Sequence, residues 1–416
     1  MDTGEFRRLW NEIEPIGRAA SAGGEPGGYV RFSWTEPDLD LRTWFHTQAK
    51  RRGLRYEEDR NGNLYAWWDA EKEQVIDPDA PHPHGAVLTG SHFDSVPHGG
   101  AYDGPLGIVS AFLAVDQLKA DGAILKRPIG IAAFTEEEGG RFGVPCLGSR
   151  LMTGAIDPGR ARALTDPDGV TLAEAMSEAG GEPDLLGPDP ERLARLAAFI
   201  ELHIEQGRAL DGSESPVSVA TAIWPHGRWR MVFTGTADHA GTTRLPDRRD
   251  PMLTFAFAVL AARKEARIAG GVATVGRVEV EPNATNAIAS TVTAWLDARA
   301  PDEAVLSEIL EGFVSKVSER AGRDSTGFEI SPESETPIVE FDASLRDRIA
   351  GLLGGAPILP TAAGHDAGVL SAHVPTAMLF VRNPHGISHA PGEAASDEDC
   401  AAGVAALAAV LRDLAC

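Results

Sequence analysis

Cysteine is scarce in this chain of 416 residues, which contains only Cys146, Cys400 and Cys416. Their scattered positions exclude a disulfide framework and a zinc site built from cysteine. Long apolar runs are also missing. No window of about 18 apolar residues is present, so no membrane span is expected. The N-terminal stretch MDTGEFRRLWNEIEPIG carries charges and lacks the apolar core of a signal peptide, so we expect a cytoplasmic protein.

Positively charged residues are also scarce in this chain. The chain has 38 lysines and arginines against 61 aspartates and glutamates, which gives a net charge of −23 and a pI near 4.9. Such a chain repels nucleic acid and anionic lipid, so neither is expected as a partner. The composition is otherwise that of a globular protein, with 43% hydrophobic and 24% charged residues. One hydrophobic core rarely organises this length, so two domains are expected.

Two buried strands with a helix between them are predicted in the first half of the chain. The apolar runs GAVLTGSH and PIGIAAF predict the strands, and PLGIVSAFLAVDQLKADG predicts the helix, with Pro105 in its first turn and Gly122 past its end. This order indicates a βαβ unit and therefore a parallel sheet. The run AAFIELHI predicts a further buried strand of the same kind.

The pattern changes in the middle of the chain. Between residues 217 and 332, alternating strands and helices follow in the order strand, helix, strand, strand, helix, strand. This order predicts an α+β module with one solvated sheet face. From 333 the α/β pattern resumes with the strand PTAMLFV and a terminal helix. The predicted fold class is therefore α/β, with a discontinuous domain (1–216 and 333–416) and an inserted module (217–332).

Histidines and carboxylates gather where the predicted buried strands end. His92, Asp94 and Asp103 lie in GSHFDSVPHGGAYDGPLGI, a stretch that is rich in glycine. The other positions are Glu136, Glu137, Glu138, His203 and His389, each after an apolar strand. Parallel sheets bind ligands at the carboxyl ends of their strands. Each residue taken singly has an ordinary explanation as a solvated or helix-capping side chain, but the set together predicts a divalent metal site.

Five motifs in this chain resemble those of the hydantoinase/carbamoylase family: GSHFDSVPHGGAYDGPLGI, FTEEEGGRF, ELHIEQG, GTADHAGTT and GISHAPGE. That family contains N-carbamoyl-L-amino acid hydrolases, β-ureidopropionase-type enzymes and allantoate amidohydrolases, within the clan of dinuclear zinc peptidases. The resemblance spans nearly the whole chain, in order. It implies a zinc-peptidase-like catalytic domain with a mostly parallel central sheet, and an inserted α+β domain for lid closure and dimerisation.

The resemblance also implies a pair of divalent metal ions in each subunit. His92 and His389 would each bind one ion, and Asp103 would bridge the two. Glu138 would complete the site of one ion, and His203 would complete the site of the other. The sequence does not decide which ion each of these residues binds. Ligands of these types suit zinc or manganese, with cobalt and nickel as alternatives.

Catalytic roles follow from the same resemblance. Glu137 would be the general base, and Asp94 would orient the imidazole of His92. His239 would donate a hydrogen bond to the oxyanion in the active site of the partner subunit, which implies a homodimer.

Substrate binding is implied for five further residues. Arg299 would bind the substrate carboxylate together with Asn286. Gln206 and the backbone around Gly364 and His365 would meet the ureido or amide end of a small ureido carboxylate. Arg248 matches an arginine of the family, and a purely structural role would also explain it.

The implied reaction is the metal-dependent hydrolysis of a linear ureido or carbamoyl C–N bond, with release of ammonia and carbon dioxide. Allantoate is the favoured substrate, and an N-carbamoyl-L-amino acid is the alternative. A dipeptidase or aminoacylase and an inactive scaffold are less favoured. The chain departs from the family in two places: Arg244 follows HAGTT, and NAIAS replaces NVIPG. Arg244 therefore leaves the side-chain preference open. His385 lies close to His389 but is not chosen as a ligand.

Overall fold

The computed structural model describes residues 3–20, 27–70 and 85–416, which form two compact units. Unit 1 comprises Met1–Thr221 and Glu340–Cys416, and unit 2 is the stretch Ala222–Val339 between them. The predicted module limits of 217 and 332 lie a few residues away from these boundaries. The strand β6 (Val217–Ile223) pairs with a strand of unit 1, and β12 (Gly327–Thr336) belongs entirely to the sheet of unit 2.

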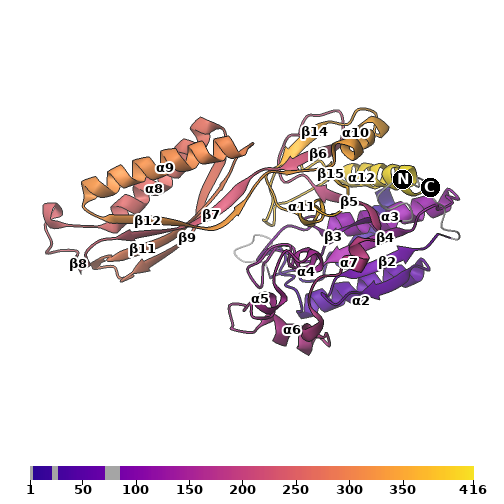
Figure 1. The fold of residues 1–416 in the computed structure, drawn as a ribbon, viewed down its shortest axis with the longest axis horizontal. Coiled ribbons are helices and arrows are strands. Elements are labelled where there is room, and N and C mark those ends of the chain that lie inside the picture. Colours follow the sequence, from indigo (N-terminus) through magenta and orange to yellow (C-terminus); the bar gives the residue numbers. More distant parts are fainter. Residues whose placement is uncertain (1–2, 21–26, 71–84) are drawn as a thin grey trace. The chain divides into compact units, whose positions relative to one another are not determined.

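A nine-stranded sheet forms the centre of unit 1, in the order β1-β2-β4-β3-β5-β15-β6-β13, with β14 paired to β6 (Figure 1). The central strands β4, β3, β5 and β15 run parallel, and the antiparallel strands β2 and β6 flank them. β3, β4 and β15 are buried at every position, because both sheet faces are covered. The strands are β1 (Arg55–Glu58), β2 (Leu64–Trp68), β3 (Ala86–His92), β4 (Ile129–Phe134), β5 (Leu196–Ile204), β13 (Val339–Glu340), β14 (Ile358–Thr361) and β15 (Thr376–Val381).

Helices of unit 1 contribute to a large and a smaller hydrophobic cluster among the described residues. The larger joins the sheet to α1 (Thr3–Ile13), α2 (Glu36–Arg51), α3 (Pro105–Ala120), α10 (Ala343–Leu352) and α12 (Asp397–Ala415). The smaller contains side chains of α4 (Leu147–Thr153), α5 (Pro158–Arg162) and α6 (Leu172–Glu178). The short helices α7 (Pro190–Leu193), α11 (Asp366–Leu370) and the 3-10 turn η1 (Pro183–Leu185) complete the unit. The parallel sheet and its helices confirm the predicted α/β class.

Unit 2 is an antiparallel sheet with two helices. Its strands lie in the order β12-β7-β11-β9, and α8 (Pro251–Ala269) and α9 (Glu303–Asp324) pack on the sheet. The strands are β7 (His226–Thr234), β9 (Val272–Glu281) and β11 (Thr291–Arg299), besides β12. A separate two-stranded pairing joins β8 (Asp238–His239) to β10 (Ala287–Ile288), and the 3-10 turn η2 (Leu245–Asp247) follows β8. This is the predicted α+β pattern.

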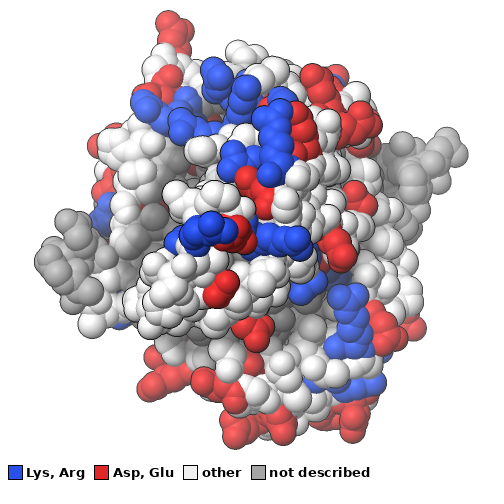
Figure 2. Space-filling model, turned by 90° about the vertical axis from the view of Figure 1, so that its left-hand side faces the viewer, with Lys and Arg blue, Asp and Glu red and all other residues white. Residues whose placement is uncertain are grey.

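Figure 2 shows lysine and arginine side chains interspersed with aspartate and glutamate on one face. None of the helices formed by the described residues has the length and apolar character needed to cross a membrane.

Candidate active site

Four adjacent parallel strands bring the predicted metal ligands to one edge of the sheet. His92 is the last residue of β3, and His203 is the penultimate residue of its neighbour β5. Glu138 follows β4, and His389 follows β15. Because β4, β3, β5 and β15 are neighbours, their carboxyl ends deliver these side chains to a common place.

Asp103 lies between two groups of candidate ligands. Its Oδ1 is 3.1 Å from His203 Nε2 and 3.5 Å from His92 Nε2. Its Oδ2 is 3.4 Å from His389 Nε2, which in turn is 3.3 Å from Glu138 Oε2. The carboxylate thus presents one oxygen to each group, which is the arrangement of a bridging ligand. In the structure, His203 lies close to His92 and Asp103, and Glu138 lies close to His389 and Asp103.

The orientation of the buried imidazoles fits metal binding. His92 Nδ1 donates to the backbone carbonyl of Asp94 (3.0 Å), and His203 Nδ1 donates to that of Ile204 (2.9 Å). Both Nε2 atoms therefore face Asp103, and neither has a hydrogen-bond partner among the described residues. A ring that donates through one nitrogen to a fixed acceptor leaves the other free for a metal.

The role of Asp94 differs from the one expected. Its carboxylate was predicted to orient His92, but the backbone carbonyl of Asp94 does so, and the carboxylate Oδ1 lies 3.6 Å from the ring nitrogen. The carboxylate instead accepts the backbone N–H groups of Glu137 (3.1 Å) and Glu138 (2.9 Å). Asp94 therefore holds the glutamate turn in place.

Three consecutive glutamates serve three different purposes. Glu136, at φ +57°, accepts the backbone N–H groups of Arg141 and Phe142 and so shapes the turn. Glu137 points into the site, where its Oε2 lies 3.6 Å from His92 Nε2. Glu138 points to His389.

The buried carboxylates of this cluster need positive charge to balance their own. Burial raises the pKa of Glu137 and of Glu138 well above the usual range, and neighbouring carboxylates add to the shift. For Asp103, the facing His203 and His92 overcome the effect of burial and hold its pKa well below the usual range. Several buried carboxylates in contact are stable only when cations or protons balance their charge. The donor set of imidazoles and carboxylates therefore fits divalent metal ions.

The predicted substrate residues of unit 1 border this cluster. Gln206 Nε2 donates to Asp103 Oδ2 at 2.7 Å. The His365 ring lies 4.5 Å from that of His203, and burial together with the charge of His203 holds its pKa well below the usual value. The His365 side chain thus reaches the cluster, although only its backbone was expected to matter. Gly364, which precedes it, is exposed.

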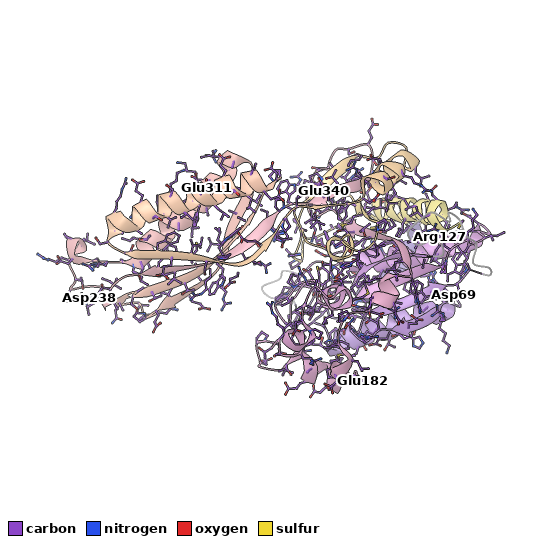
Figure 3. The ribbon with its side chains drawn as sticks, in the orientation of Figure 1. Asp69, Arg127, Glu182, Asp238, Glu311 and Glu340 are labelled. Atoms are coloured by element: carbon purple, nitrogen blue, oxygen red, sulfur yellow. The ribbon has the colours of Figure 1, made fainter. Side chains whose placement is uncertain are left out.

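The predicted residues of unit 2 fall into two places. His239 and Asn286 are neighbours, because Ala287 is paired with His239 and Ala240 N–H donates to the Asn286 carbonyl (3.0 Å). Figure 3 shows the adjacent Asp238 at the end of the unit that carries β8. Arg299 ends β11 and is held by Asp297 (2.9 Å). β11 (Thr291–Arg299) alone spans roughly 25 Å at about 3.4 Å per residue, and Asn286 precedes its first residue while Arg299 is its last. The sequence had suggested that Asn286 and Arg299 act together on one carboxylate. Within one chain, however, the two residues lie far apart.

The remaining arginines and His385 have local explanations. Arg248 donates to the carbonyls of Thr243 (3.0 Å) and Ala240 (2.6 Å), so it holds the loop that carries His239. Arg244 is exposed and pairs with Asp247 (2.7 Å). His385 is exposed, and its backbone N–H donates to Asn383.

Several residues that the sequence did not single out also contact the cluster, and Glu393 and Cys146 are among them. Glu393 accepts the backbone N–H groups of Tyr102 and Asp103, and Cys146 Sγ lies 3.5 Å from Glu137 Oε1. Glu393 is the last residue of the motif GISHAPGE, so its place in that motif was the available signal. No pattern pointed to Cys146.

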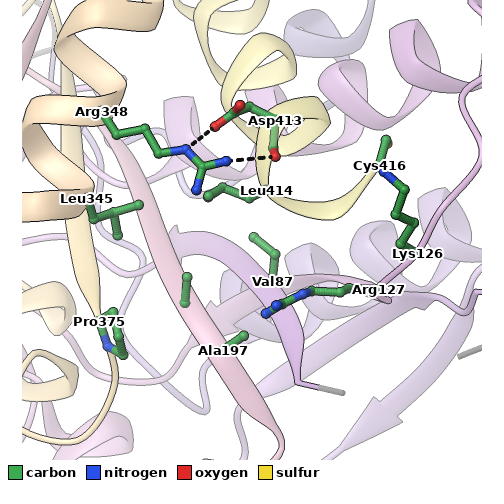
Figure 4. Close-up of a pocket in the computed structure, with 11 residues that line it drawn as sticks. Val87, Lys126, Arg127, Ala197, Leu345, Arg348, Pro375, Asp413, Leu414 and Cys416 are labelled. Atoms are coloured by element: carbon green, nitrogen blue, oxygen red, sulfur yellow. Dashed lines mark hydrogen bonds and ion pairs between the residues drawn. The ribbon is translucent and has the colours of Figure 1, made fainter. Parts of the chain in front are cut away.

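A cavity of about 240 Å³ lies at the opposite edge of the sheet (Figure 4). Val87 and Ala197, near the starts of β3 and β5, line it together with Arg127 and Arg348. Arg348 is paired with Asp413 at 2.7 Å, as the dashed lines in Figure 4 show. The cavity is therefore remote from the candidate metal ligands, which occupy the carboxyl ends of the same strands.

The fold and this constellation define a hydrolase of the kind that uses divalent metal ions. The chain belongs to the peptidase family M20/M25/M40, whose model matches residues 88–413. It is 35% identical over 409 residues to the N-carbamoyl-L-amino acid amidohydrolase of Geobacillus stearothermophilus, covering 96% of each chain. It is 31% identical over 419 residues to the allantoate amidohydrolase of Escherichia coli (strain K12), covering 99% of this chain and 98% of that one.

A solved structure has the same fold over the whole chain. The hydantoinase/carbamoylase family amidase from Burkholderia vietnamiensis superposes with a TM-score of 0.84 at 28% identity, covering 100% of this chain and 99% of that one. The family resemblance seen in the five motifs is thereby confirmed.

Proposed function

We propose that this protein is a metal-dependent amidohydrolase that cleaves the ureido C–N bond of a small ureido carboxylate and releases ammonia and carbon dioxide. Allantoate is the first candidate substrate, and an N-carbamoyl-L-amino acid is the second. The observation that carries the proposal is the bridging position of Asp103 between two ligand groups, with Glu137 beside them. The similarity to amidohydrolases named for each of these substrates supports both candidates.

Two ions, zinc or manganese with cobalt or nickel as alternatives, would be held by two overlapping sets of residues. His92, His203 and Asp103 form one set, and Asp103, Glu138 and His389 form the other. Divalent ions bound there would lower the pKa of water and polarise the substrate carbonyl. Three cysteines without disulfides suit a reducing compartment, so the cytoplasm is the proposed location.

Glu137 is the proposed general base. It is buried, it is absent from both ligand sets, and its carboxylate faces the same space as His92 Nε2. It would take a proton from the attacking water and pass it to the leaving nitrogen. Burial raises its pKa, which suits a group that must hold a proton between these two steps.

His239 is the proposed oxyanion donor. Its Nδ1 accepts the backbone N–H groups of Gly241 (3.0 Å) and Thr242 (3.2 Å). The ring proton of a neutral imidazole therefore resides on Nε2, which is exposed and free to donate to a developing negative charge.

Recognition of the substrate carboxylate is assigned to Arg299. Its guanidinium offers parallel donors, and Asp297 holds the side chain in position at 2.9 Å. A ureido carboxylate spans only a few bond lengths, whereas roughly 25 Å of β11 separates Arg299 from His239 and Asn286. One substrate therefore does not meet all three residues of one chain, which supports a homodimer in which the partner supplies His239 and Asn286.

The surface of unit 2 supports the same proposal. α8 exposes Met252, Leu253, Leu260 and Ile268, and the neighbouring edge strand β9 exposes Val272 and Val278. Exposed apolar side chains beside an unpaired strand edge are typical of an interface between copies. A symmetric dimer would cover this face in both chains.

The deciding experiment is ammonia release by protein that has been reconstituted with manganese or zinc in separate samples. The substrates would be allantoate, N-carbamoyl-L-amino acids with several side chains, and a dipeptide control followed by amine release. Turnover of allantoate alone would assign that substrate. Turnover of carbamoyl amino acids would assign the alternative, and the preference among side chains would define the pocket. Dipeptide cleavage without ammonia from any ureido compound would refute the proposal.

A further inference from the structure

Glu393 joins the two loops that carry Asp103 and His389. It lies four residues after His389, and it is buried, with 6% of its surface exposed. Its Oε1 accepts two backbone N–H groups, from Tyr102 (2.8 Å) and from Asp103 (2.9 Å). A single carboxylate oxygen thus fixes two consecutive peptide units of the loop before α3.

Gly100 makes room for this contact. A Cβ built on Gly100 would lie 2.3 Å from both the carboxyl carbon and Oε1 of Glu393. The backbone of Gly100 is not in the left-handed region, so space and not conformation requires glycine here. A side chain at position 100 would therefore have to displace the Glu393 carboxylate.

The hydrogen bonds to Asp103 are divided between its backbone and its side chain. Gln206 Nε2 (2.7 Å) and Ser388 Oγ (3.3 Å) donate to the Oδ2 atom, while Glu393 accepts from the backbone. Glu393 itself is in neither ligand set. Glu393 would therefore act on the metal ions only indirectly, by holding Asp103, the residue that would bridge both ions.

We propose that Glu393 is a positioning residue that ties the Asp103 loop to the His389 loop and thereby sets the affinity for both metal ions. The inference rests on the proposed function, because it takes Asp103 and His389 as metal ligands. Outer groups that orient ligands typically change metal affinity by roughly 10–100-fold when they are removed.

The proposal requires an acceptor oxygen at the end of the side chain at position 393. Three variants test this requirement. Glu393→Ala removes the acceptor, and we expect weaker metal binding by roughly 10–100-fold. Glu393→Gln keeps an amide oxygen at the same place, so its affinity should stay within a few-fold of wild type. Gly100→Ala should resemble Glu393→Ala, because the new Cβ displaces the carboxylate from the other side. In the double variant Gly100→Ala/Glu393→Ala, the second change should add little, since both act on one contact.

The experiment is a titration of chelator-treated protein with Zn²⁺, and separately with Mn²⁺, against a competing fluorescent chelator. It yields the number of ions bound and their Kd values. Thermal unfolding of the metal-free variants gives their stability independently. Glu398→Ala, a change of an exposed glutamate in the first turn of α12, is the matched control and should bind metal like wild type.

Three outcomes would overturn the inference. The first is wild-type metal affinity in Glu393→Ala. The second is reduced stability of that variant with unchanged affinity, which would indicate a purely structural role. The third is equal loss in Glu393→Gln and Glu393→Ala. If Glu393→Ala does not fold, Gly100→Ala and Glu393→Gln still decide the question. Failure of the wild-type protein to bind any metal would instead remove the proposed function, and this inference with it.

Discussion

The carboxylate of Asp94 accepts the backbone N–H of Glu138 at 2.9 Å. This bond, with its companion to Glu137 at 3.1 Å, ties the turn after β3 to the turn after β4. The proposed base and one ligand group therefore depend on a residue that contacts no metal position directly. We expect Asp94→Asn to lower kcat by roughly 10–100-fold, because an amide N–H₂ would face one of the two backbone donors. Steady-state kinetics with metal content measured in parallel would check this, and unchanged kcat would contradict it.

Glu137→Gln and Glu138→Gln form a pair that distinguishes a base from a ligand. Glu137→Gln should reduce kcat by roughly 10²–10⁴-fold while the protein still binds two ions, since only the proton transfer is lost. Glu138→Gln should instead weaken one of the two metal positions, because Glu138 faces His389. Metal analysis beside kinetics checks both variants. The same metal loss in each would argue against the assigned roles.

Mixed dimers test whether His239 acts in the partner's site. His239→Ala and Glu137→Gln should each be nearly inactive as homodimers. In a mixed dimer, one of the two sites regains both residues, so about half of the wild-type activity should return. Co-expression with two different tags isolates the mixed species, and ammonia release measures it. No recovery in a verified mixed dimer would mean that His239 serves its own chain, whereas a fully active His239→Ala homodimer would mean that His239 has no catalytic role.

Arg299 and Arg228 share Asp297 as an ion-pair partner, which makes Arg228 the control for Arg299. Arg228 Nε lies 3.2 Å from Asp297, and Arg299 Nε lies 2.9 Å from it. Arg299→Lys should lower kcat/KM by roughly 10–100-fold, mainly through KM, because a lysine lacks the fork that pairs with a carboxylate. Arg228→Lys should leave both constants near wild type. Equal effects in the two variants would contradict a role of Arg299 in binding substrate.

The stability of metal-free protein should depend on Glu136. Burial, with a contribution from Asp94, raises the pKa of Glu136 to about 7. A carboxyl group whose folded pKa is raised stabilises the fold below its unfolded pKa, near 4.5, and this contribution is lost as the pH rises to about 7. Glu136→Gln should therefore stabilise chelator-treated protein at pH 8 by up to about 3 kcal/mol. At pH 4.5, close to the unfolded pKa, the gain should be small.

Chemical denaturation at the two pH values measures this difference. Glu174→Gln is the control, because Glu174 lies exposed at the start of α6, and it should show no such gain at pH 8. An equal gain at both pH values for Glu136→Gln would contradict the assignment to its titration.

The sequence by itself determined the class of the fold and the chemistry of the ligands. The runs around β3, β4 and β5 are apolar throughout, which predicts buried parallel strands, and His92, Glu138 and His203 follow or end those runs. These are local patterns, because period and composition are properties of short stretches. The five motifs extended the prediction to His389 and to the inserted module.

Only the tertiary structure decided how these pieces meet. β15, from the far end of the chain, lies beside β5 and brings His389 next to Glu138. Strand order likewise decides that His203 lies near His92 and that Asn286 lies far from Arg299. The contact of the Asp94 carboxylate with the glutamate turn depends on local backbone angles, such as φ +57° at Glu136. Pairing partners distant in sequence and the direction of a side chain after a turn are set by packing, and neither leaves a periodic signal in the sequence.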